Sequence, residues 1–71
     1  MMTNKHFNDF AAILAMHIDA CEKLLDEDLP DADEIRGYLY AYQQVARDFA
    51  HIAAEDNPHF DRARFLTACG A

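Results

Sequence analysis

The chain has few of the residues that interrupt or staple a fold. It contains two Gly, two Pro and two Cys among 71 residues. So few helix breakers predict long uninterrupted elements. Cys21 and Cys69 stand far apart and do not form the pattern of a disulfide framework, so we expect both to be buried as small apolar groups.

Long apolar runs and basic residues are also scarce. No apolar run approaches the roughly 20 residues of a membrane span. Residues 1–5 lack the apolar core and cleavage pattern of a signal peptide, so we expect a cytoplasmic protein. Six Lys and Arg stand against 13 Asp and Glu, and the net charge is −7. This balance disfavours direct binding to nucleic acid and favours a basic partner.

Apolar residues spaced by three and four predict two long helices. The first covers about residues 4–25, with Phe7, Phe10, Leu14, Ile18, Cys21 and Leu25 as its main stripe. Ala11, Ile13, His17 and Leu24 widen that stripe. Pro30 forces a turn, and Asp31 with Glu34 predicts a capping box for a second helix over about 32–55.

The second helix carries a stripe close to a heptad seam. Its members are Ile35, Tyr38, Leu39, Tyr42, Val45, Ala46, Phe49, Ile52 and Ala53. We therefore expect Tyr38 and Tyr42 to be in the core, and Tyr40, which points roughly the opposite way, to be exposed. Gly37 lies inside this helix, where it is either needed for close helix approach or simply tolerated.

A short third helix is predicted over about 62–69. Asp61 suits its N-cap. Phe60 and Phe65 have the spacing of a hydrophobic staple, and Gly70 lies where a glycine ends a helix. The fold class is therefore all-α: one domain, residues 1–71, of two long antiparallel helices and a short C-terminal helix. A second copy could complete the core as a four-helix arrangement, so a homodimer is an open alternative.

Acidic residues concentrate where the first helix ends and the second begins. This acidic knuckle consists of Asp19, Glu22, Asp26, Glu27, Asp28, Asp31, Asp33 and Glu34. Capping and the helix dipole explain the acids at the start of the second helix, namely Asp31, Asp33 and Glu34. At the end of the first helix the dipole instead disfavours acidic residues, which there are Asp19, Glu22 and Asp26. The knuckle, together with the exposed Tyr40, is our candidate surface for a protein partner.

Other chemistry fits less well. Asp26 and Asp28 mimic the start of a calcium loop. The pattern then fails, because Pro30 stands at its fifth position and Gly37 stands at its twelfth position, where the loop needs Glu. His17 and Cys21 share a helix face, yet a metal site needs further ligands. No base or oxyanion group accompanies either cysteine, so we expect no cofactor, no metal and no enzyme.

The C-terminal tail, residues 54–70, contains the pattern Asn-Pro-x-Phe-Asp-x-x-Arg-Phe-x-x-Ala-Cys-Gly. It resembles the ending of many small bacteriophage and mobile-element proteins whose activity is not established. This resemblance implies a bacterial host as the setting. In size and charge the chain is also similar to anti-CRISPR proteins, which occupy nucleic-acid-binding surfaces with carboxylates.

The sequence thus leads to one main hypothesis and one alternative. The main hypothesis is a non-enzymatic, phage-derived module that docks its acidic knuckle on a basic host protein or nucleoprotein complex, such as a defence complex. The alternative is a homo-oligomeric structural or accessory protein that acts through its own helical interface.

Overall fold

The structure, a computed structural model, describes residues 3–71. The N-terminal residues 1–5 are predicted to lack a signal peptide. The first two of them, Met1 and Met2, lie outside the described residues. The chain forms α1 (Asn4–Leu25), α2 (Ala32–Asp56) and α3 (Arg62–Cys69), with no strand within residues 3–71. The predicted all-α class is confirmed, and α2 ends one residue beyond the predicted boundary.

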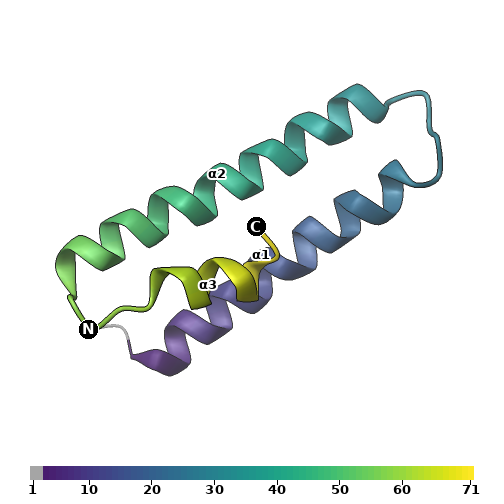
Figure 1. The fold of residues 1–71 in the computed structure, drawn as a ribbon. Helices are drawn as coiled ribbons and strands as arrows, with labels where there is room; N and C mark the ends of the chain where they lie inside the picture. Colours follow the sequence, from purple (N-terminus) through teal and green to yellow (C-terminus); the bar gives the residue numbers. More distant parts are fainter. Residues whose placement is uncertain (1–2) are drawn as a thin grey trace.

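The two long helices run antiparallel, and α3 folds back along one end of them (Figure 1). The resulting rod measures 43 × 18 × 18 Å. Gly70, which follows α3, lies beside the side chain of Ile18, about two thirds of the way along α1. Between that level and the α1–α2 turn, the two long helices therefore pack only against each other.

The core lies where all three helices meet. Its buried cluster comprises Ala11, Leu14, Ala46, Ala50, Phe65 and Cys69. Ala46 and Ala50 are fully buried, and their small side chains allow α2 to approach its neighbours closely. Phe49 fills the space beside them, with its ring centroid 4.7 Å from that of Phe10 and 5.4 Å from that of Phe65. Full burial of one such aromatic, as at Phe65, contributes about 1.5–3 kcal/mol.

The predicted inner stripes are wider than the surface that the helices bury. On α2, Tyr38 is 54% exposed, Val45 48% and Ile52 64%, so the core position expected for Tyr38 is wrong. Of the flanking residues on α1, Ile13, His17 and Leu24 are exposed as well, whereas Ala11 is buried as expected. A helix that contacts two neighbours buries only the arc facing them, and these residues lie beyond that arc.

The start and end of α3 follow the prediction. The side chain of Asp61 accepts a hydrogen bond from the backbone N–H of Arg64 at 3.0 Å. The Phe60 and Phe65 rings lie 5.6 Å apart, which confirms the hydrophobic staple. Gly70 adopts the left-handed conformation with φ of 77°, and the N–H of Ala71 donates to the carbonyl of Leu66. These bonds complete a glycine-dependent helix ending.

Candidate protein-binding surface

The acidic knuckle forms the end of the rod that α3 does not reach (Figure 1). All eight of its acidic residues are exposed. The turn brings the last turns of α1 and the first turn of α2 together, so charges that are spread over 16 positions of the chain gather at one end. The structure therefore places the predicted acidic residues, all exposed, at the same end of the rod.

Local partners engage three of these acids. Lys23, the one basic residue between Asp19 and Glu34, has its Nζ 2.9 Å from Asp19 Oδ2. Arg36, just outside that window, adds a second ion pair at 2.7 Å from Asp33. The hydrogen bond to Asp19, and then its charge, raise the pKa of Lys23 above its ordinary value. Both pairs are exposed, so water screens them.

Glu34 has a different neighbour. The Tyr38 hydroxyl donates a hydrogen bond to the Glu34 carboxylate at 3.3 Å. The negative charge of Glu34, followed by this hydrogen bond, raises the pKa of Tyr38 above its ordinary value. This contact accompanies the exposed position of the Tyr38 ring on the outer flank of α2.

The other five acids make no side-chain hydrogen bond or ion pair within residues 3–71. They are Glu22, Asp26, Glu27, Asp28 and Asp31. The capping box predicted for α2 is wrong, because Asp31 is the N-cap residue but its side chain makes no cap hydrogen bond. Carboxylates without such contacts are solvated, and they can accept hydrogen bonds from the basic side chains of a binding partner.

The turn itself is held by the backbone. The N–H of Asp26 donates to the carbonyl of Glu22, and that of Glu27 donates to Leu24. Asp28 takes a positive φ of 52°, which is uncommon for a residue with a side chain and more accessible to Asp than to most. This conformation reverses the chain before Pro30.

Tyr40 is exposed, as predicted, with 63% of its surface accessible. It follows Asp33 by seven residues, which places both on the same face of α2, about 10 Å apart along the helix axis. Tyr40 therefore lies beside the knuckle on the outer surface, where an aromatic ring can contact a partner that engages the acids.

His17 and Cys21 do not form part of a metal site in the described part of the chain. No group of three or more His, Cys, Asp or Glu side chains is close enough to hold a metal among residues 3–71. The His17 imidazole instead stacks on the Tyr42 ring, with centroids 5.1 Å apart and planes inclined by 14°. Cys21 and Cys69 are both buried free thiols, as predicted.

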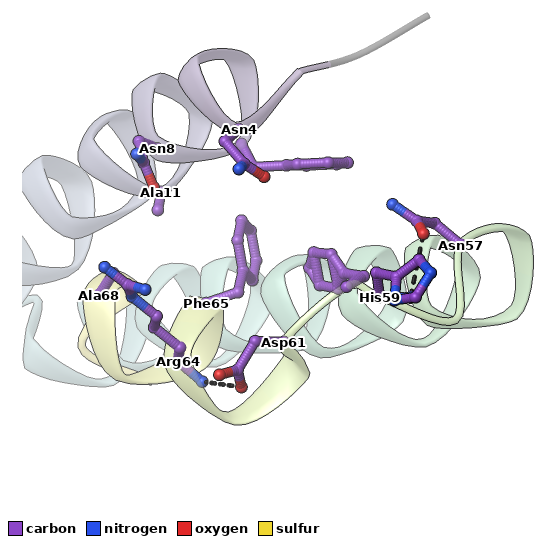
Figure 2. Close-up of a pocket in the computed structure, with 11 residues that line it drawn as sticks. Asn4, Asn8, Ala11, Asn57, His59, Asp61, Arg64, Phe65 and Ala68 are labelled. Atoms are coloured by element: carbon purple, nitrogen blue, oxygen red, sulfur yellow. Dashed lines mark hydrogen bonds between the residues drawn. The ribbon is translucent and has the colours of Figure 1, made fainter.

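A shallow cleft of about 270 Å³ lies between α1 and the chain leading into α3, and sequence reasoning did not find it (Figure 2). Phe7, Phe60 and Phe65 supply apolar lining, while Asn4, Asn8, Asn57, His59, Asp61 and Arg64 supply polar lining. Two of these polar groups serve the local fold: Asp61 caps α3, and Asn57 Oδ1 accepts from the N–H of His59 at 3.0 Å.

The tail pattern is thus largely explained by structure. Asn57 forms a turn, Asp61 a cap, Phe65 and Cys69 belong to the core, and Gly70 ends the helix. A signal for the cleft was present in the clustering of Asn57, Phe60 and Arg64. Which residues of α1 they would meet depends on how α3 folds back, and the local pattern does not contain that information.

Comparison with protein-family models, with curated proteins and with solved structures found no match to this chain. Among the described residues, none of the helices combines the length and apolar character needed to cross a membrane.

Proposed function

We propose that this chain is a non-enzymatic protein-binding module that docks its acidic knuckle on a basic surface of a host protein or nucleoprotein complex. The observation that carries this proposal is the exposure of all eight knuckle acids at one end of the rod, five of them with no partner among residues 3–71. A surface of this kind attracts basic sites over several ångströms and speeds encounter with them.

The position of the acids on α1 supports a role beyond folding. Asp19 and Glu22 lie in the last two turns of α1, and Asp26 is its C-cap residue. The negative end of the helix dipole disfavours acidic side chains there. Glu22 and Asp26 therefore lower the stability of the helix that carries them, as expected of charges that serve a partner, whereas Asp19 lies about two turns from the helix end and pairs with Lys23.

A carboxylate-rich end about 18 Å across is suited to a site that otherwise holds phosphates. In this proposal the module competes with nucleic acid for a basic surface, as an anti-CRISPR or other anti-defence inhibitor would. The phage origin and the defence complex as partner rest on the tail resemblance and on size and charge.

The test compares two variants of equal net charge. The first neutralises the knuckle with Asp26→Asn, Glu27→Gln and Asp28→Asn. The control makes the same three-charge change at the other end of α2 with Asp48→Asn, Glu55→Gln and Asp56→Asn. Each immobilised protein is used to capture partners from a bacterial host lysate, and bound material is eluted with salt and, separately, with duplex DNA.

We expect wild type and the control to capture the same protein in similar amounts. The knuckle variant should capture at least tenfold less of it. Elution by moderate salt and by DNA is expected, because the contact is ionic and competes with phosphates. Circular dichroism should show that the knuckle variant stays folded. Equal capture by both variants would contradict the proposal.

A further inference from the structure

A second surface, which adjoins the acidic knuckle where the Tyr38 hydroxyl donates to Glu34, is apolar. Ile13 and Leu24 of α1 and Tyr38, Val45 and Ile52 of α2 are each at least 41% exposed. We call these five residues the apolar face. Together they leave several large side chains in water on a rod only 18 Å wide. Single exposed apolar residues are ordinary, whereas aligned ones mark an interaction surface.

The α2 members form a straight row. Tyr38, Val45 and Ile52 are spaced by seven residues, so each is rotated only about 20° from the one before. The row is about 21 Å long at 1.5 Å per residue. On α1, Ile13 and Leu24 are eleven residues apart, about three turns, and so also share one side of their helix.

The two rows lie on the same side of the hairpin. His17 and Tyr42, which stack between α1 and α2, join them. His17 stands one turn from Ile13 and two turns from Leu24, and Tyr42 stands one turn from both Tyr38 and Val45. The stacked pair is therefore the seam between the two rows.

The side facing α3 is different. Asn8 lines the cleft against α3, and Ala50 is buried in the cluster that contains Phe65. Asn8 is five residues from Ile13, and Ala50 is five residues from Val45, so each pair is separated by about 140° around its helix. The apolar face is thus the flank of the hairpin that α3 leaves uncovered.

We propose that a second copy of this chain docks on the apolar face, with the two rods antiparallel and their acidic knuckles at opposite ends. This proposal is independent of the proposed function, since it uses apolar residues and none of the knuckle acids. A two-fold axis across the rods brings α2 against α2 of the second copy. The row then complements itself: Val45 meets Val45 of the second copy, and Tyr38 meets Ile52.

Charge selects this orientation over the parallel one. The knuckle holds eight of the 13 acids, and Lys23 and Arg36 are its two neighbouring bases, which leaves five acids and four bases for the rest of the chain. In a parallel dimer the two knuckles would lie together and repel. In the antiparallel dimer each knuckle instead lies beside the C-terminal end of α2 of the other copy, where Asp48, Glu55 and Asp56 stand against Arg47, so fewer like charges face each other than in the parallel dimer.

The size of the face fits a reversible dimer. A row of about 21 Å on a rod 18 Å wide gives roughly 400 Å² for each copy, or about 800–1,000 Å² for the pair once surface relief is counted. This lies below the roughly 1,200 Å² at which stable specific interfaces begin and is typical of weak, transient ones, so we expect dissociation in the micromolar range or above.

The first experiment measures solution mass by sedimentation equilibrium from low micromolar to millimolar concentration. We expect wild type to pass from a monomer of 8.1 kDa to a dimer. Val45→Gln and Ile52→Gln should each shift the dissociation constant upward by tenfold or more. Tyr40→Gln is the matched control, because Tyr40 is equally exposed on α2 but lies outside the apolar face, and its mass curve should equal that of wild type.

The second experiment tests the orientation. Val45→Cys, in a background where Cys21 and Cys69 are changed to Ala, should form an intermolecular disulfide on mild oxidation, and Tyr40→Cys should form far less. If the copies instead pack with α2 against α1, Val45→Cys alone should not cross-link, and a disulfide should form only when it is mixed with Ile13→Cys. That result would overturn the antiparallel arrangement. If wild type stays monomeric up to millimolar concentration, the proposed dimer is wrong. The apolar face would then be assigned to a different protein partner.

Discussion

Asp61 Oδ1 accepts a hydrogen bond from the backbone N–H of Arg64 at 3.0 Å. This amide is one of those at the start of α3 that have no partner within the helix. Asp61→Ala removes the acceptor, and we expect a loss of about 1 kcal/mol in the free energy of unfolding. Urea unfolding followed by circular dichroism, at one protein concentration for all variants, measures this loss.

Asp31→Ala provides the matched control at the start of α2. Asp31 occupies the same N-cap position, but its side chain makes no cap hydrogen bond. We expect its replacement to change the free energy of unfolding by less than about 0.5 kcal/mol. A similar loss in both variants would show that Asp31 caps α2 in solution and would contradict the difference between the two helix starts.

The two glycines should respond to alanine in opposite directions. Gly37 lies inside α2, and a Cβ at this position would meet nothing within 4 Å. Gly37→Ala should therefore stabilise the protein by about 0.5–1 kcal/mol, because Ala has the higher helix propensity and leaves the unfolded chain less freedom. Gly70→Ala should destabilise by about 1 kcal/mol, because φ of 77° disfavours a side chain. Thermal unfolding of both variants tests this pair, and a destabilised Gly37→Ala would indicate close packing against this position.

Helix positions could be predicted from sequence because they depend on local signals. The spacing of Phe7, Phe10 and Leu14 defines α1, and Asp61 with Gly70 defines α3. The outer flanks could not be predicted in the same way. Val45 and Ile52 fit the helical period as well as Ala46 does, and only the placement of α1 and α3 decides which of them is buried.

The candidate site shows the same division. Exposure of the knuckle acids follows from their charge and from the turn at Pro30, so it could be predicted. The ion pair between Arg36 and Asp33 lies one helical turn along α2 and depends on side-chain rotamers. The cleft beside Arg64 and the apolar face depend on where α3 folds back, which is a tertiary relationship that the periodicity of one helix does not contain.

We expect Cys69 to make the stability of the fold depend on pH in the alkaline range. Its thiol is fully buried, and burial raises its pKa above the ordinary value. In the unfolded chain the thiol ionises near pH 8.5. Below that pH both states hold the proton and Cys69 adds no pH dependence. As the pH rises through it, the unfolded state releases a proton that the folded state keeps, so the free energy of unfolding falls.

Urea unfolding at about pH 7 and about pH 9.5, under reducing conditions, measures this fall. Cys69→Ala is the control, because it removes the titrating group while leaving the other ionisable residues in place. The variant starts from a lower stability, owing to the smaller side chain in a packed core, but its stability should decline less between the two pH values. Equal declines in wild type and Cys69→Ala would mean that the folded protein ionises this thiol as readily as the unfolded chain does, which its buried position opposes.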